Sequence, residues 1–489
     1  RECLLSRGLG DVYKRQGITF EYWSIICMTR KSSVILLYFE VIFLSGLKLS
    51  FVMKRMYKTT YDKSDCQTGI VHIGYGAFHR SHQAVYIDDY MEKTGDLRWG
   101  IVAVNLRNEG FREIENYVLK TPTSYRLVRS HLDYIDWTKN RTIAKHMLAL
   151  QSVHLVTITV TESGYAPGSP LFEYLACGLR NRKTPITIMC CDNIRQNGIV
   201  LETQFLAYLY QTNQYELADW VRENVYFPSC MVDRITPRTT HVLREEVEEL
   251  YPDFGYNAIQ CEEYTQWVIE DKFASDFPDL SQVGVTITNN LEPYEETKIR
   301  ILNGGHTSLA YIGVLSGYDT FDQVMNDKAH RNHFKQLQKE EIIPSIEMEL
   351  PFDIDEYAEI IEERLSSAAN HDELERICMD GFTKFHTFIL PSLRVCLDQG
   401  KRPIHTYRSI AGWYIYARKF ARGCSKIRYT EPNWLLLEPL LQDGALDAFV
   451  SNERLWGDIP KKYITFSRDL KSILMSHTYE KEIDLLGED

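Results

Sequence analysis

Short apolar runs alternate with longer amphipathic stretches from Thr68 onward, and this alternation decides the class of fold. Four runs rich in β-branched residues are typical of buried parallel strands, and they cover residues 70–73, 100–106, 153–160 and 186–191. Amphipathic stretches such as 83–93 lie between them. Strand–helix alternation of this kind predicts an α/β, doubly wound, Rossmann-type domain, which we expect to span residues 67–289.

The second half of the chain has a different character. Residues 298–313, 321–341, 354–367 and 433–449 have the periodicity of amphipathic helices, and prolines at positions 391, 403, 432 and 460 punctuate this half. We therefore expect a mostly helical substrate and catalytic domain over residues 290–489. Because no Ser/Gly-rich linker separates the two parts, their interface is expected to be extensive.

Residues 1–66 differ from the rest of the chain. The apolar stretch 34–53 is interrupted by Glu40, Gly46 and Lys48, whereas a membrane span needs about 20 mostly apolar residues. No signal-peptide cleavage site follows it. The opening residues resemble translated adaptor sequence, and Met53 or Met56 is a plausible natural start. We expect residues 1–66 to be a non-native or disordered extension.

Charge and cysteine usage limit the partners and the compartment. The net charge is -12, and no long basic stripe offsets it, so nucleic acid and anionic membrane are not expected partners. The 11 cysteines are odd in number and form no CxxC pair, which favours reduced thiols in a cytoplasmic protein over a disulfide frame or a zinc site. His79 and His82 have metal-compatible spacing, but no carboxylate or cysteine beside them completes a site.

A glycine turn follows the first predicted strand and precedes a helix. Glycines at this point let the backbone approach a pyrophosphate, which the helix N-terminus stabilises. The third glycine of the usual fingerprint is replaced by histidine, so the strand–turn–helix context carries the prediction of dinucleotide binding. The cofactor-binding candidates in this segment are Gly74, Gly76, Phe78, His79 and Arg80.

Two residues after the second predicted strand bear on the choice of dinucleotide. Glu109 would bind the adenosine ribose hydroxyls and favour NAD, whereas Arg107 could meet the 2′-phosphate of NADP. A solvated loop is the alternative for both residues. We expect NAD, and the sequence leaves NADP open.

The segment 298–306 carries the candidate chemistry. At about 100° per residue, Lys298, His306 and Asn303 fall near 0°, 80° and 140° on an α-helix and share one broad face. Oxidation of a secondary alcohol needs a base for the hydroxyl proton and donors for the developing carbonyl oxygen. A lysine whose pKa is lowered by burial can be that base, and the asparagine and histidine can be the donors. A structural helix with a surface lysine is the alternative.

Seven ordered blocks resemble one family. They are IVHIGYGAFHRSHQA (70–84), TITVTESGY (157–165), CDNIRQNG (191–198), FPSCMVDRITPR (227–238), QWVIEDKF (266–273), PYEETKIRILNGGH (293–306) and RICMDGFTK (376–384). With these blocks the chain resembles the polyol-specific long-chain dehydrogenases, the family of mannitol dehydrogenase, over nearly everything from Gly69 onward.

The resemblance implies roles for individual residues. Lys298 would be the catalytic base, Asn303 and His306 would polarise the substrate oxygen, and Glu295 would relay the proton outward. The family uses no metal. Its substrate and cofactor contacts correspond here to Asn193, Asp233, Arg376 and Lys384 for the substrate and Val232 for the cofactor.

The loop that holds Phe382 bears on the choice of substrate. Many mannitol enzymes carry DGSSK where this chain has DGFTK, and an aromatic residue there is similar to the members that oxidise D-arabinitol. Phe382 could shorten the pocket and favour a five-carbon polyol, although one bulky group typically shifts discrimination by only about 1–3 kcal/mol. We expect oxidation of D-arabinitol to D-xylulose. The alternatives are D-mannitol oxidation, hexuronate reduction and a catalytically silent cofactor-binding sensor, in a monomer or small homo-oligomer.

Overall fold

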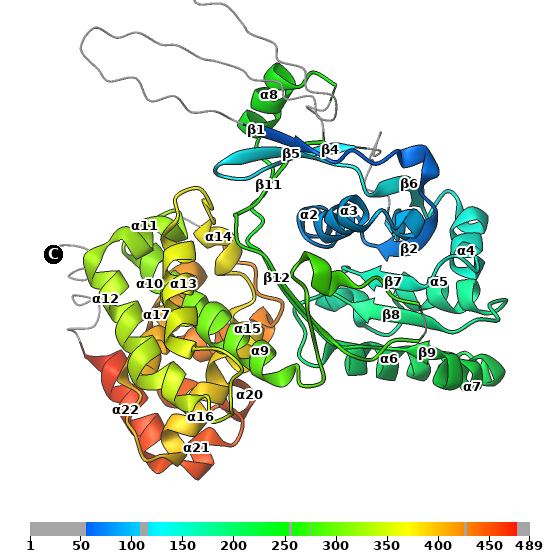
Figure 1. The fold of residues 1–489 in the computed structure, drawn as a ribbon. Helices are drawn as coiled ribbons and strands as arrows, with labels where there is room; N and C mark the ends of the chain where they lie inside the picture. The colour runs from blue at the N-terminus through cyan, green and yellow to red at the C-terminus, as the bar shows by residue number, and fades with distance from the viewer. Residues whose placement is uncertain (1–54, 108–115, 254–256, 275, 425–427, 477–489) are drawn as a thin grey trace, which may run out of the picture.

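The computed structural model describes residues 55–107, 116–253, 257–274, 276–424 and 428–476. The chain folds into a half built on β-sheets and a half built almost wholly of helices, which lie side by side (Figure 1). The predicted fold class, a Rossmann-type domain followed by a mostly helical domain, is therefore confirmed.

A six-stranded parallel sheet forms the centre of the first half. Its strands are in the order β6-β3-β2-β7-β8-β9. All four strands predicted from apolar runs are present, and the strand bounds are β2 (Thr68–Ile73), β3 (Gly100–Asn105), β6 (His131–Asp136), β7 (Leu155–Ile158), β8 (Ile186–Cys190) and β9 (Val225–Tyr226). Because β2 pairs with β3 on one side and with β7 on the other, the strand order reverses at β2. Ligands of such sheets bind at that point.

Helices cover both faces of this sheet. Alternate side chains of β2 face opposite layers, so Ile70 packs with α3 (Gln83–Thr94) while Val71 and Ile73 pack with the other layer. That second layer contains α4 (Arg141–Ala149), α5 (Pro170–Leu179), α6 (Asn197–Gln211) and α7 (Tyr215–Asn224). The sheet is thereby buried on both faces, as a parallel sheet requires.

Two smaller sheets were not predicted from the sequence. One has the order β1-β5-β4-β11, with β1 (Arg55–Lys58), β5 (Ser124–Val128), β4 (Tyr117–Lys120) and β11 (Ile259–Gln260). The other has the order β10-β12-β13, with β10 (Cys230–Asp233), β12 (Gln266–Glu270) and β13 (Thr286–Thr288). The first half also contains α2 (Ala77–Ser81) and α8 (His241–Leu250).

The folded part of the chain begins earlier than expected. Strand β1 pairs in parallel with β5, and the Met56 side chain packs against a buried apolar cluster. The expectation that residues 55–66 belong to an extension is therefore wrong, because an edge strand of four residues is too short to give a periodic signal. Residues 1–54 lie outside the described residues.

The second half begins at α9 and is helical within the described residues. Its longer helices are α10 (Gly305–Leu315), α12 (Lys328–Leu337), α13 (Ile354–Ser366), α16 (Leu390–Asp398), α17 (Ile404–Ala421) and α22 (Ile464–Met475). Shorter ones are α9 (Glu292–Thr297), α11 (Phe321–Asn326), α14 (Leu374–Ile377), α15 (Gly381–Lys384), α18 (Trp434–Leu437), α19 (Leu446–Val450), α20 (Glu453–Trp456) and α21 (Ile459–Lys462). Three segments are π-helices: η7 (Lys298–Gly304), η8 (Gln338–Ile342) and η10 (Phe385–Ile389).

Two of the predicted helices are interrupted. The stretch 321–341 breaks at Asp327, whose carboxylate accepts a hydrogen bond from the His330 N–H and so begins α12. The stretch 433–449 breaks into α18, a 3₁₀ turn that contains Pro439, and α19. Caps and prolines therefore divide amphipathic patterns that looked continuous.

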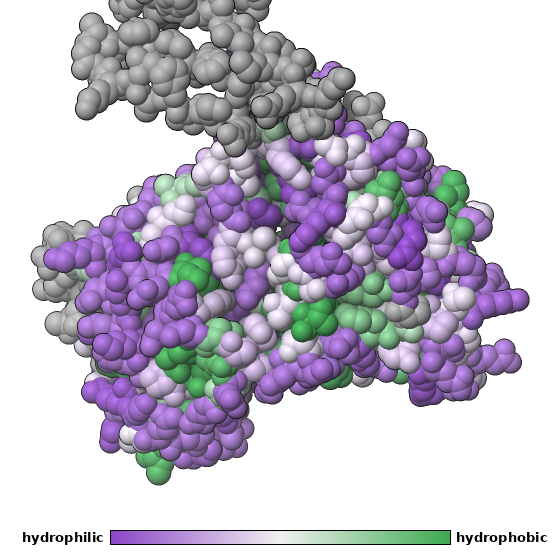
Figure 2. Space-filling model, in the orientation of Figure 1, coloured by the Kyte–Doolittle hydropathy of each residue, from purple (hydrophilic) through white to green (hydrophobic). Residues whose placement is uncertain are grey.

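Hydrophilic residues dominate the face shown in Figure 2, and hydrophobic residues form small separate patches on it. Among the described helices, none is long and apolar enough to cross a membrane. The nine cysteines within the described ranges are all free thiols.

Trp413 of α17 lies at the centre of the helical half. Its ring stacks on Phe385 with centroids 4.6 Å apart, and its indole N–H donates to the Tyr429 hydroxyl at 2.8 Å. Trp413→Ala should lower the free energy of unfolding by about 3–5 kcal/mol, because it removes a large side chain that is only 1% exposed. Urea denaturation followed by circular dichroism measures the loss. Leu435→Ala, at a residue 89% exposed, is the control and should change stability by less than about 0.5 kcal/mol; equal effects of the two variants would contradict this packing.

Candidate active site

A cavity of about 550 Å³ lies where the two halves meet. The Rossmann half contributes the glycine turn, the ends of β7 and β8 and strand β10, while the helical half contributes η7, α10, α14 and α15. Of the predicted site residues, ten line this cavity: Gly76, Phe78, Asn193, Val232, Asp233, Lys298, Asn303, His306, Arg376 and Lys384. The topology thus brings together residues that are far apart in the sequence.

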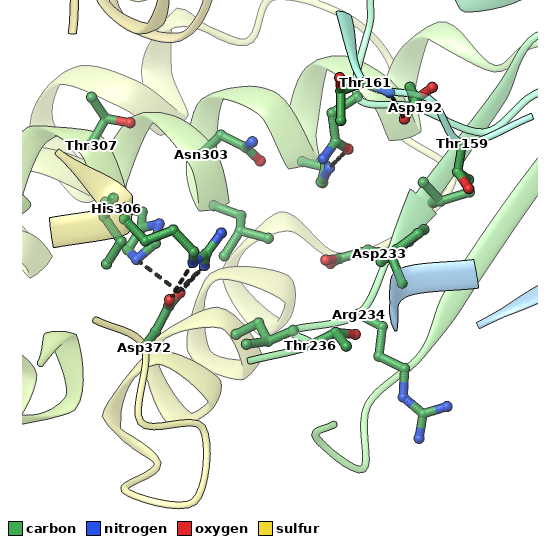
Figure 3. Close-up of a pocket in the computed structure, with 18 of the residues that line it drawn as sticks. Thr159, Thr161, Asp192, Asp233, Arg234, Thr236, Asn303, His306, Thr307 and Asp372 are labelled. Atoms are coloured by element: carbon green, nitrogen blue, oxygen red, sulfur yellow. Dashed lines mark hydrogen bonds and ion pairs between the residues drawn. The ribbon is translucent and has the colours of Figure 1, made fainter. Parts of the chain in front are cut away.

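Lys298 and Asn303 lie on a π-helix rather than on the α-helix assumed from the sequence. The π-helix η7 joins α9 to α10, and its hydrogen bonds connect residues five apart. Residues five apart therefore lie one above the other, so Lys298 and Asn303 face the same cavity more closely than α-helical spacing allows. His306 follows in the first turn of α10, and both Asn303 and His306, labelled in Figure 3, line the cavity.

The Lys298 amine is buried at the base of the cavity. Lys298 is 5% exposed, and its Nζ donates a hydrogen bond to Oδ1 of Asn193, 2.5 Å away. Burial lowers the pKa of Lys298; the Asp233 carboxylate opposes this shift and the Arg364 guanidinium adds to it. The surface-lysine alternative does not fit this environment, and a neutral amine that can accept a proton does.

Asn303 and His306 present polar atoms without a protein acceptor or donor. Oδ1 of Asn303 and Nε2 of His306 are buried and have no hydrogen-bond partner. Asp372 is near this imidazole, with Oδ2 3.7 Å from Nε2, and Figure 3 shows that contact. Burial lowers the pKa of His306 to about 4, so the ring is neutral at physiological pH. Unsatisfied buried polar atoms that face a cavity are suited to hold a ligand oxygen.

Glu295 lies behind the lysine rather than in the cavity wall. Its Oε1 accepts a hydrogen bond from the Gln196 N–H at 2.9 Å, and it is close enough to Lys298 for the two charges to interact. Burial raises the pKa of Glu295 to about 7. A carboxyl group that exchanges protons near neutrality, beside a buried amine, has the properties that a proton relay needs.

The far wall of the cavity carries two cations. Arg376 donates to both oxygens of Asp372, at 2.5 Å each, and Lys384 donates to the Ile377 carbonyl at 2.6 Å. Burial, with Arg376 nearby, lowers the pKa of Lys384 to about 8. Both side chains therefore offer donors to hydroxyl groups at this end of the cavity.

Phe382 does not line the cavity, which corrects the expectation that it shortens the pocket. Asp380 has a left-handed conformation, with φ +53°, and begins the short helix α15. Because residues two apart on a helix point about 200° apart, Lys384 faces the cavity and Phe382 faces away from it. The Phe382 ring packs against His386 instead, with centroids 4.7 Å apart. The phenylalanines that do line the cavity are Phe78 and Phe388.

A second pocket, of about 240 Å³, continues from the first along the carboxyl edge of the sheet. Gly74, Gly76, Asn105 and Arg107 line it, and Gly76 lines both pockets. Gly74 has φ +97°, and a Cβ there would lie 2.0 Å from the Thr159 carbonyl oxygen. A Cβ on Gly76 would meet no atom closer than 3.9 Å, so a side chain at this position would project into the open groove. Glycine leaves that space free. The backbone can therefore approach a pyrophosphate here, as a dinucleotide requires.

The other predicted cofactor residues lie at the pocket rim, behind the glycine turn or outside the described residues. Arg107 is exposed at the pocket rim, whereas Glu109 lies outside the described residues. His79 and Arg80 are buried behind the turn: His79 stacks on His72, with centroids 3.2 Å apart, and Arg80 contacts the Gly76 carbonyl at 3.4 Å. These two side chains support the glycine turn and do not reach either pocket.

The sequence reasoning missed several residues of the site. Asp192 fixes the loop at the end of β7 by accepting from the Val160 N–H at 2.9 Å and the Tyr165 hydroxyl at 2.6 Å. Arg195 crosses between the halves to Glu296 and to the Thr387 carbonyl, at 2.5 Å each. Arg364 crosses at a second place to Asp233. Their partners are distant in the sequence, and the one local signal is that Asp192 and Arg195 stand beside Asn193 in a matched block.

Within the described ranges, no cluster of three or more His, Cys, Asp or Glu side chains has the arrangement of a metal site. His79 and His82, whose spacing raised that question, are both fully buried, and the His82 Nε2 contacts the Gln266 carbonyl at 2.9 Å. The cavity instead joins a dinucleotide-sized groove to a buried amine. That combination defines a nicotinamide-dependent dehydrogenase as the class of protein.

Comparisons with known proteins give the family. Residues 68–282 match the mannitol dehydrogenase Rossmann domain, and residues 290–472 match the mannitol dehydrogenase C-terminal domain. The chain therefore belongs to the mannitol dehydrogenase family, and it is an oxidoreductase.

Individual relatives agree with this assignment. Mannitol 2-dehydrogenase of Phaeosphaeria nodorum is 31% identical over 464 residues, covering 85% of this chain and 80% of the relative. D-mannonate oxidoreductase of Escherichia coli is 32% identical, covering 77% and 85% respectively. The structure of Pseudomonas fluorescens mannitol 2-dehydrogenase in a ternary complex with NAD and D-mannitol is 28% identical, with a TM-score of 0.78, and covers 88% of this chain and 96% of that one.

Gly76 offers a direct test of the groove. Gly76→Val should raise the dissociation constant for NADH at least about tenfold, because the valine side chain would fill the space that the pyrophosphate of the dinucleotide needs. Protein fluorescence during NADH titration measures this. Gly76→Ala adds one methyl group in the same place and should have a smaller effect. Unchanged affinity in the valine variant would mean that the dinucleotide does not cross the turn.

Proposed function

We propose that this protein is an NAD-dependent polyol dehydrogenase that oxidises one secondary alcohol of an open-chain sugar alcohol to a ketone, reversibly, with Lys298 as the general base. The observation that carries the proposal is the buried Lys298 amine, held by Asn193 and facing the unpartnered polar atoms of Asn303 and His306. NAD, when bound, supplies the acceptor for the hydride that leaves the carbinol carbon. Gly74, Gly76 and Val232 would hold it.

The path of the proton follows from the positions of two titratable groups, Lys298 and Glu295. A neutral Lys298 amine takes the hydroxyl proton, and burial, which lowers the pKa of this lysine, favours that neutral form. Glu295, with a pKa of about 7, then receives the proton and passes it out of the cleft. In ketose reduction the same groups return the proton to the oxygen.

The substrate oxygen needs donors as it becomes a carbonyl. Neutral His306 can donate through Nε2, which has no hydrogen-bond partner, and the Asn303 amide lines the same cavity. Donors that are in place before the reaction stabilise the developing charge without reorganisation. Arg376 and Lys384 would hold the distal hydroxyl groups.

Charge at the cavity wall favours a neutral substrate over a hexuronate. Among the described lining residues, each cation already has an acceptor: Lys298 contacts Asn193, Arg376 contacts Asp372, Lys384 contacts the Ile377 carbonyl, and Arg234 contacts the Ser81 and Glu262 carbonyls. A substrate carboxylate would in addition lie near the Asp233 and Asp372 carboxylates, which line the same cavity. Hydroxyl groups, which both donate and accept, can use the remaining N–H donors without that repulsion.

D-Arabinitol remains the first substrate that we propose, with D-xylulose as the product, and D-mannitol is the second. The support for D-arabinitol is that two segments, 293–303 (PYEETKIRILN) and 401–403 (KRP), resemble those of the family members that oxidise D-arabinitol. Phe382 adds no support, because it does not line the cavity. The names of several relatives support D-mannitol. We also propose a monomer or small homo-oligomer in the cytoplasm.

A substrate panel tests the proposed function. The full chain would be assayed with NAD and with NADP against D-arabinitol, D-mannitol, D-sorbitol and xylitol, and in reverse with fructuronate and tagaturonate. We expect NAD-linked oxidation, with the highest kcat/KM for D-arabinitol. A preference for D-mannitol would mean that D-mannitol is the substrate, and the proposed type of reaction would stand. Reduction of a uronate alone, or no turnover with any compound, would contradict the proposal.

Lys298→Ala tests the base. Removing a general base typically costs about 10²–10⁴-fold, so kcat should fall by at least a hundredfold while the affinity for NADH changes little. Stopped-flow turnover and NADH titration measure the two quantities. Lys419→Ala, at an exposed residue in the last turn of α17, is the control and should behave as the wild type. Near-normal turnover in Lys298→Ala would remove this residue from the mechanism.

A further inference from the structure

The Asp233 carboxylate, whose charge acts on Lys298, is hydrogen-bonded to an arginine. Arg364, near the end of α13, donates from Nη1 to Asp233 Oδ2 at 2.7 Å and from Nη2 to Asp233 Oδ1 at 3.0 Å. The same guanidinium donates to both oxygens of Glu262, at 3.0 Å and 2.7 Å. Its carbon lies 3.9 Å above the centre of the Tyr264 ring. Four of the five N–H donors of the guanidinium are thereby used.

This contact crosses between the two halves of the molecule. Asp233 ends β10 and Glu262 follows β11, both in the Rossmann half, whereas Arg364 belongs to the helical half. The Arg364 and Asp233 side chains are 6% and 5% exposed, so solvent screens the pair little. Arg364 does not itself line the cavity, but its neighbour Leu365 and its partner Asp233 do. It can therefore act on the site only through Asp233.

We propose that Arg364 is a positioning residue for catalysis: by holding both oxygens of Asp233, it prevents this carboxylate from pairing with Lys298 and so keeps the lysine amine free for the substrate. This inference rests on the proposed function. It assigns the ion pair a role beyond joining the two halves.

The charges around Lys298 give the sign of the effect. Those that face the amine are Asp233 on β10, Arg364 on α13, Glu295 on α9 and His82 at the start of α3, while Asn193 contributes a neutral amide. Burial keeps His82 neutral by lowering its pKa to about 3. Burial alone would raise the pKa of Asp233, but Arg364 holds that pKa below its usual value. Without Arg364, the only strong cation left for Asp233 among these groups is protonated Lys298.

The experiment is the pH profile of kcat/KM for polyol oxidation in Arg364→Met. Oxidation requires neutral Lys298, so kcat/KM falls as the pH falls through the pKa of the lysine. An uncompensated Asp233 stabilises the protonated amine, so this acidic limb should move to higher pH by about one unit or more. Arg364→Lys, which keeps the charge and loses the two-pronged contact, should move the limb less.

Two further variants make the result decisive. Arg331→Met removes a partly exposed arginine that contacts Glu362 of α13 at 2.6 Å, and its limb should coincide with that of the wild type. Arg364→Met/Glu262→Gln removes the second carboxylate together with the cation. It should show the same shift even if the single variant folds poorly.

A lower kcat in the Arg364 variants with an unmoved limb would overturn the proposal and leave a purely structural ion pair. Absence of NAD-linked oxidation in the wild type would instead overturn the proposed function itself, so the two failures are distinguishable.

Discussion

The chemistry of this protein depends on one buried amine at the junction of two domains. Lys298 is removed from solvent by the meeting of the Rossmann sheet and the helical half, and its immediate contact is the amide of Asn193 rather than a carboxylate. Removing an ammonium ion from water without a paired anion favours its neutral form. The neighbouring groups of the site preserve this neutral form. Asp233 is occupied by Arg364, and His306 is neutral because it is buried as well.

The two halves have separate tasks that meet at this amine. The sheet reverses strand order at β2, which places the glycine turn and the groove for the dinucleotide at its carboxyl edge. The helical half supplies the proposed base and oxygen donors on one continuous segment, in which the π-helix η7 aligns residues five apart. The arginines at positions 195 and 364 connect the halves on either side of the cleft. The relative position of cofactor and base is therefore fixed by buried ionic contacts as well as by apolar packing.

The sequence predicts most of this arrangement and misses specific parts of it. The four central strands and the segment 298–306 carry strong local patterns, and all of them are found where expected. Strands β1 (RMYK) and β11 (IQ) contain no apolar β-branched run, so the pattern that reveals the central strands does not reveal them. The direction of Phe382 depends on the left-handed Asp380 that begins its helix, which composition does not indicate. The Arg364 contact joins residues 131 apart in the chain, so only the fold brings it about.

The protonation of Lys298 can be measured without any substrate. Nuclear magnetic resonance of protein labelled with carbon-13 at the lysine ε position, with the Lys298→Ala variant used for assignment, gives the titration midpoint of this one amine. The account predicts a midpoint clearly below the ordinary lysine value of 10.5. A midpoint at or above that value would show a stably charged ammonium group at the base of the cleft, and general-base catalysis by this residue would then be excluded.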